Sequence, residues 1–306
     1  MRVFPDMQAQ SLGDDFKVGH YTDEDARTGC TVVIPPRGNV TSCDVRGSSP
    51  GSRELISLHT GRRLTEIHAL LFTGGSAFGL AAADGVMAWL AERDVGYQTG
   101  VAIVPIVPTA VVFDLGEGRP DVRPGPDQGR AACDAARAGD IAIGRVGAGT
   151  GATVGKWAGR GYASPGGLGV AHAEANGMSV AALAVVNSVG DVTEADGSVI
   201  AGTTAPDPHL FPELPPLPEE EGPPGNTVLC VATMRAALEK RDVRWLASRA
   251  SDGITVSIRP AHTRYDGDVA VTIAAPPEEG AAPPDLDVLG ALTTEAVAKA
   301  VRTAVA

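Results

Sequence analysis

One threonine that could serve as a nucleophile lies where the character of the chain changes abruptly. Residues 204–225 are rich in proline and carry three consecutive glutamates at 219–221. Such a segment cannot form a helix or a central strand, so it predicts an exposed loop. Asn226-Thr227 follows directly, and the apolar run 228–233 predicts a buried strand. The junction is therefore either a domain boundary or a processing site.

A cut before Thr227 would give this residue a free α-amine beside its own hydroxyl. An unperturbed α-amine has a pKa of about 7.7–8.0, which suits a general base near neutral pH. The same hydroxyl could first attack the Asn226 carbonyl to form an ester that water resolves, and Gly225 would allow the turn that this attack needs. Taken alone, an Asn-Thr pair before a strand is more often an ordinary loop-to-strand junction.

Longer motifs in a fixed order carry more information than this pair. They are Val18-Gly19-His20, RTGCT at 27–31, DVRG at 44–47 with PGSRE at 50–54, TGGSAFGLAAADG at 73–85, PIVPTAVVFDL at 105–115, GAGTGATVGK at 147–156, VN at 186–187, NTVLCVAT at 226–233 and RPAHTRYDGD at 259–268. With these motifs the chain, from about Val18 to its C-terminus, resembles the self-processing L-aminopeptidase/D-amidase-esterases. That family includes β-peptidyl aminopeptidases and the 6-aminohexanoate (nylon) oligomer hydrolases.

The resemblance implies a role for each of five site residues. Asn226-Thr227 matches the scissile pair, which makes Thr227 the nucleophile. Asn187 matches an asparagine that helps to form the oxyanion hole. Asp266 and Asp268 match two acidic or polar positions that orient the nucleophile and its amine.

Two further positions relate the chain to particular members of that family. Lys156 matches a lysine near the nucleophile in the nylon-oligomer hydrolases, and the threonine nucleophile with two aspartates also resembles that subgroup. Phe113 stands where some members have a tyrosine. If the tyrosine supplies an oxyanion proton there, Asn187 and backbone N–H groups must do so here.

These residue types suit the roles that the resemblance implies. A lysine ammonium is a like charge to an N-terminal ammonium, so Lys156 would lower the pKa of the amine and favour its basic form. The negative charges of Asp266 and Asp268 would instead raise the pKa of the amine, but these carboxylates could orient the amine and the hydroxyl. Because they flank Gly267, an extended chain would place both carboxylates on one face. The alternative for Asp-Gly-Asp is a hairpin turn.

The resemblance also implies the fold and the assembly. We expect an α/β fold, a four-layer αββα sandwich of the N-terminal-nucleophile type, in which 1–306 form a single catalytic domain. Self-cleavage would give fragments 1–226 and 227–306 that remain one unit, and the protein would form a homo-oligomer, a tetramer. The substrate would carry a free amino group near the scissile bond, as short peptides, amino-acid amides, β-peptides and 6-aminohexanoate oligomers do. No metal or organic cofactor is implied.

Hydrophobic patterning places the elements that would position these residues. Strands are expected at 39–46, 67–73, 180–186, 228–233 and 269–274, and helices at 77–93, 127–138, 234–250 and 286–305. Short apolar runs fill 17–34, and residues 141–154 are rich in glycine. Residues 101–112 are apolar but contain Pro105 and Pro108, which predicts a broken or edge strand.

Composition excludes several classes of function. The formal net charge of −12 gives the chain little attraction for nucleic acid or anionic lipid. No segment approaches the length of a membrane span, and the first twenty residues do not predict a secretory signal. The four widely spaced cysteines are interpreted as small buried thiols in a reducing cytoplasm, which makes a cytoplasmic protein the expectation.

Other motifs favour ordinary structural roles. Gly74-Gly75-Ser76 begins like a nucleophile elbow, but the fifth position is Phe78 rather than glycine. Residues 150–157 contain Gly-Lys as a phosphate-binding loop does, but Thr150 and Trp157 stand where that pattern needs glycine and Ser or Thr. Gly147, Gly149 and Gly151 do not complete a dinucleotide fingerprint. The six histidines show no metal-binding spacing and are interpreted as structural or surface residues. Asp44, Arg46, Arg53 and Glu54 form either a buried ion network beside the site or plain surface charge.

Two other functions remain open from the sequence. One is acyl transfer of the ornithine acetyltransferase type, in which the chain is also cut before a threonine. The other is a protein that is never cut and serves as a non-catalytic binding protein.

Overall fold

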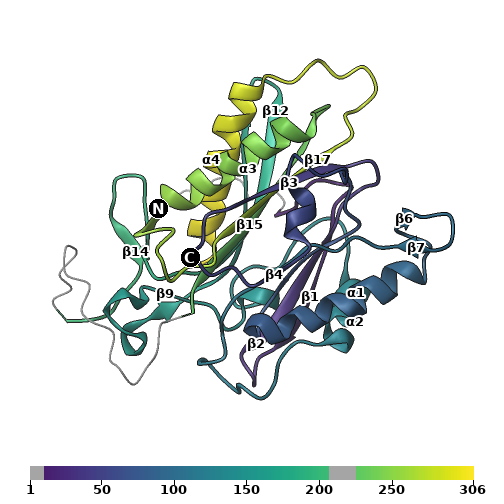
Figure 1. Ribbon diagram of the computed structural model, residues 1–306. Coiled ribbons are helices and arrows are strands. Elements are labelled where there is room, and N and C mark those ends of the chain that lie inside the picture. The colour runs from purple at the N-terminus through teal and green to yellow at the C-terminus, as the bar shows by residue number, and fades with distance from the viewer. Residues whose placement is uncertain (1–9, 207–224) are drawn as a thin grey trace.

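Two five-stranded sheets and four α-helices make up most of the computed structural model, which describes residues 10–206 and 225–306 (Figure 1). One sheet has the order β1 (Lys17–Asp23), β2 (Thr28–Ile34), β5 (Leu70–Thr73), β8 (Thr109–Val111) and β4 (Ser52–Arg53). The other has the order β11 (Gly167–Ala175), β12 (Met178–Asn187), β15 (Thr227–Arg235), β17 (Val269–Ala275) and β3 (Val40–Val45).

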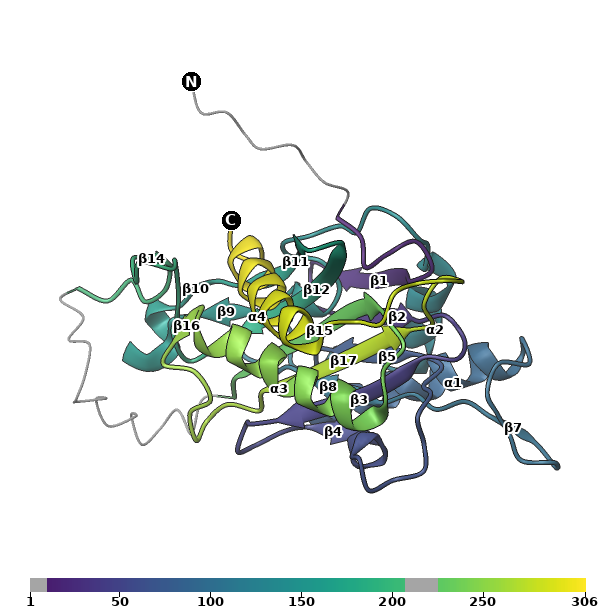
Figure 2. The same cartoon turned by 90° about the horizontal axis from the view of Figure 1, so that it is seen from above.

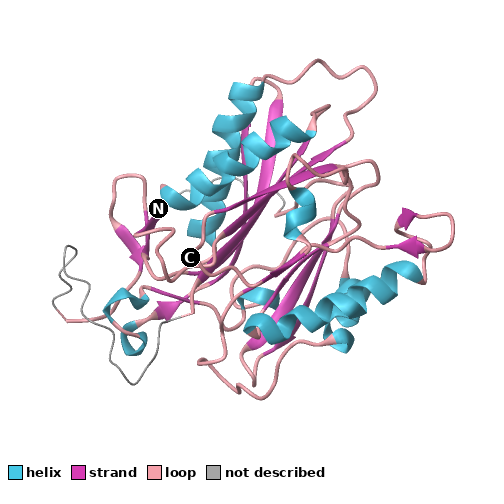
Figure 3. Ribbon diagram, viewed as in Figure 1, coloured by secondary structure: helices cyan, strands magenta, loops and turns pink. Residues whose placement is uncertain are grey.

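The helices lie on the outer sides of the sheets (Figures 2 and 3). They are α1 (Ala82–Ala91), α2 (Pro126–Ala135), α3 (Lys240–Thr255) and α4 (Leu286–Thr303). Helices α3 and α4 pack on the sheet that contains β15, and α2 packs on β1 and β2 with α1 beside it. The chain thus belongs to the mixed α/β class, as the sequence predicts.

Three smaller sheets contain the remaining strands of the described residues. They are β14 (Val199–Ala201), β13 (Asp191–Thr193) and β16 (Ile258–Arg259) in one sheet, β10 (Ser164–Pro165) with β9 (Thr153–Val154), and β6 (Tyr97–Gln98) with β7 (Ile103–Val104). The β6–β7 hairpin extends away from the body of the molecule beside α1 (Figure 1).

Strand β15 shows how the sequence produces this packing. Side chains alternate across a strand, so neighbouring residues face opposite sides of the sheet. Val228 and Cys230 belong to the apolar cluster formed with α3 and α4. Leu229 and Val231 belong to a second cluster, which lies between the two sheets and includes Phe72 of the facing sheet. A third apolar cluster packs α1 and α2 against the outer face of that sheet.

Several expected boundaries differ from the structure, and two of these differences are at the starts of helices. The helix expected at 234–250 begins only at Lys240, because the strand alternation continues through buried Met234 and exposed Arg235. The helix expected from residue 77 opens with a 3₁₀ segment, Ser76–Ala81, before α1. Residues 101–112 are broken at Pro105 and Pro108 as predicted, but β8 lies inside its sheet, between β5 and β4.

Strand β11 was not predicted because its glycines weaken the apolar pattern. A Cβ at Gly169 would lie 2.1 Å from the Ala300 carbonyl oxygen of α4. The glycine therefore lets the helix approach the sheet backbone closely. This requirement comes from tertiary packing, which no local pattern reveals.

Further expectations can be compared with the described residues. All four cysteines are buried and unpaired, as predicted. No helix within 10–206 or 225–306 is long and apolar enough to cross a membrane. Residues 207–224, which make up most of the expected Pro-rich loop, lie outside the described residues.

Candidate active site

The predicted nucleophile lies at the first residue of the central strand β15. Antiparallel strand β12 ends where β15 begins, and Asn187 is the register partner of Thr227. On the other side β17 runs parallel to β15, with Leu229 opposite Val269. Asp268 immediately precedes β17. Sheet topology thus brings Asn187, Thr227 and Asp268 to one end of the sheet although they are distant in sequence.

The hydroxyl of Thr227 is held against the peptide bond that precedes it. Thr227 is buried, and its Oγ1 donates to the Asn226 carbonyl oxygen. The same oxygen accepts the backbone N–H of Gly267 at 2.8 Å. A Cβ at Gly267 would lie only 2.8 Å from Thr227 Oγ1, so a glycine is needed for this approach. The Gly267 N–H is thus placed as a backbone donor to this carbonyl oxygen, as in an oxyanion hole, while the Thr227 hydroxyl lies beside the same carbonyl group.

Gly225 has a packing role at the entry to the site. A Cβ at this position would lie 2.3 Å from Cγ of Phe113. The chain therefore passes directly over the Phe113 ring just before Asn226. The sequence suggested glycine here for a turn, whereas the structure shows a close approach to an aromatic side chain.

Asp268 forms a charged pair that the sequence did not reveal. Its Oδ1 accepts the Val228 N–H at 2.6 Å, and its Oδ2 lies 2.7 Å from Nδ1 of His262. Nε2 of His262 lies 3.2 Å from the Ser251 carbonyl oxygen. Both ring nitrogens therefore face acceptors, an arrangement that favours the imidazolium. Burial opposes the charge, but the hydrogen bond and charge of Asp268 raise the pKa of His262 above its ordinary value.

The histidine was interpreted from sequence as a structural or surface residue. Spacing rules search for clusters that bind metal, and His262 instead contacts groups from α3 and from the residue before β17. Its place inside the RPAHTRYDGD motif was the only signal that could have pointed to it. No group of His, Cys, Asp and Glu side chains in the described parts of the chain is arranged to hold a metal ion.

Asp266 binds partners different from those of Asp268. Its Oδ2 accepts the N–H and the hydroxyl of Thr263 at 2.8 and 2.6 Å, and its Oδ1 lies 3.4 Å from the Val189 nitrogen. Burial and the charge of Asp268 raise the pKa of Asp266 to about 6. Asp266 also forms a parallel bridge with Asn226, so the chain here runs alongside the predicted cleavage site rather than folding into a hairpin.

Lys156 and Asn187 form a buried polar pair beside this site. Nζ of Lys156 donates to Asn187 Oδ1 at 2.7 Å, and the Thr153 N–H donates to the same oxygen at 3.0 Å. Asn187 Nδ2 in turn donates to the Phe113 carbonyl at 3.2 Å. Burial, with a smaller contribution from Arg160, lowers the pKa of Lys156 to about 7. Because of this burial, Lys156 can gain or lose its proton near neutral pH.

A cavity of about 820 Å³ opens onto the predicted nucleophile. Asn226 and Thr227 lie in its wall with Ser49, Phe113 and Tyr265. Ser76 lines the same cavity, as expected of a turn beside the site, but no hydrogen bond of its side chain to a base occurs among the described residues. An elbow-type serine mechanism therefore has no support.

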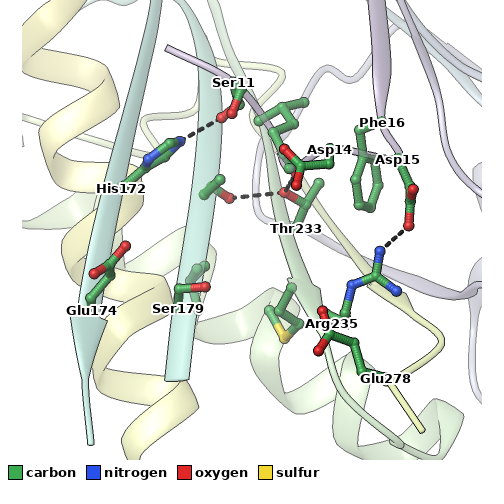
Figure 4. Close-up of a pocket in the computed structure, with 15 residues that line it drawn as sticks. Ser11, Asp14, Asp15, Phe16, His172, Glu174, Ser179, Thr233, Arg235 and Glu278 are labelled. Atoms are coloured by element: carbon green, nitrogen blue, oxygen red, sulfur yellow. Dashed lines mark hydrogen bonds and ion pairs between the residues drawn. The ribbon is translucent and has the colours of Figure 1, made fainter. Parts of the chain in front are cut away.

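A second cavity, of about 440 Å³, lies at the opposite end of β15 and is drawn in Figure 4. It is lined by acidic residues such as Asp14 and Glu174, and the dashed contacts tie the N-terminal segment to the sheet. His172 Nε2 lies 2.5 Å from the Ser11 carbonyl oxygen, and Arg235 pairs with Asp15. These contacts fasten the segment before β1, whereas the predicted nucleophile lies at the other end of the strand.

The expected charge network beside the site divides into two parts. The Asp44 carboxylate forms ion pairs with the guanidinium groups of Arg46, at 2.9 Å, and of Arg244 in α3, at 2.8 Å. Arg53 instead pairs with Asp84 of α1 at 2.6 Å. Ion pairs of this kind tie helices to sheets.

Comparison with known proteins identifies the family. The model of peptidase family S58 matches residues 14–306. This chain belongs to peptidase family S58. It is 41% identical over 289 residues to an uncharacterized aminopeptidase of Mycobacterium tuberculosis, covering 86% of this chain and 82% of that protein. It is 31% identical over 271 residues to a 6-aminohexanoate-oligomer endohydrolase of Agromyces, covering 85% and 72%.

A solved structure shares the fold of this S58 chain. The L-aminopeptidase D-Ala-esterase/amidase of Ochrobactrum anthropi superposes with a TM-score of 0.71 at 18% identity, covering 96% of this chain and 85% of that one. Its description places it among variants of the Ntn hydrolase fold. The resemblance stated from the motifs is confirmed, and the protein is a hydrolase of peptide or amide bonds.

Proposed function

We propose that the chain cuts its own peptide bond between Asn226 and Thr227 and then uses Thr227 as an N-terminal nucleophile. The observation that carries this proposal is the contact of the Thr227 hydroxyl with the Asn226 carbonyl oxygen, which also accepts the Gly267 N–H at 2.8 Å. A nucleophile lies beside the bond to be cut, and a backbone donor is in place for the negative charge that develops on its oxygen.

The proposed cut proceeds in two balanced steps. Thr227 Oγ1 attacks the carbonyl carbon of Asn226, and the C–N bond breaks as the hydroxyl proton passes to the departing nitrogen. The product is an ester with a free α-amine on Thr227. Water then hydrolyses the ester, which leaves a carboxylate on Asn226 and restores the hydroxyl.

In the mature enzyme the α-amine of Thr227 would act as the general base for its own hydroxyl. Asp268 accepts the next backbone N–H, so it is placed to orient the start of β15. Lys156 would act through Asn187, which it contacts directly. The Asn187 amide donates one proton to Phe113 and has a second for the oxyanion of an acyl-threonine.

The proposed substrates are short peptides, β-peptides or 6-aminohexanoate oligomers. The names of the relatives support linear amides of this kind, and family membership favours hydrolysis over acyl transfer or a non-catalytic role. We further propose that the two fragments stay together as a four-layer αββα unit that forms a cytoplasmic tetramer. The three apolar clusters support the layering.

A pair of variants tests this function. Thr227→Ala should remain a single chain and should hydrolyse no amide, whereas Thr227→Ser should retain both reactions because it keeps the hydroxyl. Hydrolysis of an aminoacyl p-nitroanilide and gel electrophoresis measure the two reactions. Full activity of Thr227→Ala would contradict the proposal.

A further inference from the structure

The cavity beside Thr227 has an unusual charge for this acidic protein. Among the described residues that line it, the one ionisable side chain that carries charge near neutral pH is Arg264. The remaining wall is neutral and includes Ser49, Ser76 and Phe113. In a chain with 37 acidic and 25 basic residues, the described side chains that line this cavity before any cut offer one cation and no carboxylate.

Arg264 lines the cavity and contacts its neighbour Tyr265. Nη2 of Arg264 donates to Tyr265 Oη at 2.5 Å, and the guanidinium lies 4.8 Å from the Tyr265 ring centroid. Arg264 is exposed and forms no ion pair with any described residue. Its remaining N–H groups are thus available to a ligand, and Tyr265 Oη keeps its own proton for donation.

The backbone that carries Arg264 is fixed relative to the nucleophile. The Asp266 N–H donates to the Thr263 carbonyl at 3.1 Å, and the Asp266 carboxylate binds Thr263 in return. Asp266 bridges Asn226, the residue before Thr227. These contacts tie the turn at residues 263–266 to the residue before the nucleophile, and Arg264 and Thr227 line the same cavity.

A second arginine, Arg123, lies near residues that flank Ser76 in the sequence. The Arg123 guanidinium is 4.1 Å from the centroid of Phe78, and a Cβ at Gly75 would lie 3.2 Å from Arg123 Cβ. Gly75 and Phe78 flank Ser76, which lines the cavity. A second guanidinium thus lies near the residues that flank one part of the cavity wall, without lining the cavity itself.

We propose that Arg264 and Tyr265 form a carboxylate-binding subsite, so that the preferred substrates are linear amides with a free carboxylate. This inference rests on the proposed amide hydrolysis at Thr227 and names the substrate class. A guanidinium presents paired donors that match the two oxygens of a carboxylate. Short peptides and 6-aminohexanoate oligomers with a free C-terminus satisfy this requirement, and their C-terminal amides do not.

The test compares matched substrates that differ only at that end. The 6-aminohexanoate dimer is assayed as the free acid and as its C-terminal N-methylamide, and the ratio of their kcat/KM values is measured. Arg264→Gln removes the cation. Arg241→Gln is the matched control, because Arg241 is an exposed arginine at the start of α3 that does not line the cavity. Binding of 6-acetamidohexanoate and of its N-methylamide, followed by calorimetry, gives a readout that does not depend on turnover.

The expected result is a preference for the free acid that falls about 2- to 5-fold in Arg264→Gln through KM, with a parallel loss in binding of 6-acetamidohexanoate. The magnitude is that of a charge pair exposed to solvent. Arg241→Gln should keep the wild-type ratio. An unchanged ratio in Arg264→Gln, or wild-type preference for the N-methylamide, would overturn the subsite and leave the proposed hydrolysis standing. Failure of the wild type to hydrolyse either substrate, while it still binds 6-acetamidohexanoate through Arg264, would count against the hydrolysis alone.

Discussion

Replacement of Lys156 by methionine should make the stability of the protein less dependent on pH. The side chain is fully buried, and its pKa is lowered from 10.5 to about 7. At 1.36 kcal/mol per pKa unit, this difference corresponds to about 5 kcal/mol lost to burial of the charge at low pH. Methionine preserves the length of the side chain and carries no charge.

The direction in which the free energy of unfolding changes with pH follows from the number of protons bound in the native and unfolded states. Between pH 7 and pH 10.5 the unfolded chain keeps Lys156 protonated while the native protein does not. The unfolded state thus binds more protons, and the wild-type free energy of unfolding rises with pH in this window. From pH 6 to pH 9 the advantage of Lys156→Met over the wild type should therefore shrink by about 2.5 kcal/mol.

A second effect of the substitution does not depend on pH. Asn187 Oδ1 would lose the ammonium but keep the Thr153 N–H at 3.0 Å, a loss of about 1 kcal/mol. Methionine should therefore stabilise the protein at pH 6.

Urea unfolding of both proteins at pH 6 and pH 9 measures the difference. Both should carry Thr227→Ala, so that one uncut chain unfolds. A difference between the two proteins that is the same at both pH values would refute a lysine held near pKa 7.

Three further changes test other parts of the site. Asn187→Ala should lower kcat by about 10²–10³ if its amide stabilises the oxyanion, and a steady-state assay that shows less than a tenfold loss would exclude that role. Gly267→Ala should slow self-cleavage, because the added Cβ would lie 2.8 Å from Thr227 Oγ1. A time course on gels measures the rate of cutting. The control Gly61→Ala, whose Cβ would meet nothing within 4 Å, should be cut at the normal rate. His262→Gln should be less stable than the wild type at pH 6 and approach it by pH 9, because a raised histidine pKa contributes stability that disappears as pH rises through it; a gap in urea unfolding that stays constant would contradict the imidazolium.

The sequence could predict elements whose side chains alternate or repeat strongly. The strand at 228–233 and the helix at 286–305 were found within a few residues of their expected limits. The end of β15 was missed because Met234 fits both a strand and a helix, and only packing decides between them. Strand β11 was missed because its glycines serve contacts with α4 that the local pattern does not contain.

The site was predicted by motif resemblance rather than by physics alone. Thr227, Asn187 and Asp268 do meet at one end of the sheet, although their sequence spacing does not show it. The lowered pKa of Lys156 also depends on burial, which only the fold reveals. His262 escaped notice because its partners come from separate elements.

The central claim is that Thr227 becomes a free N-terminus, and the intact mass of the purified wild-type protein tests it most directly. The account predicts two chains, 1–226 and 227–306, that elute together before denaturation, and a single uncut chain for Thr227→Ala. A wild-type preparation that hydrolyses amides while remaining one uncut chain of 306 residues would contradict it.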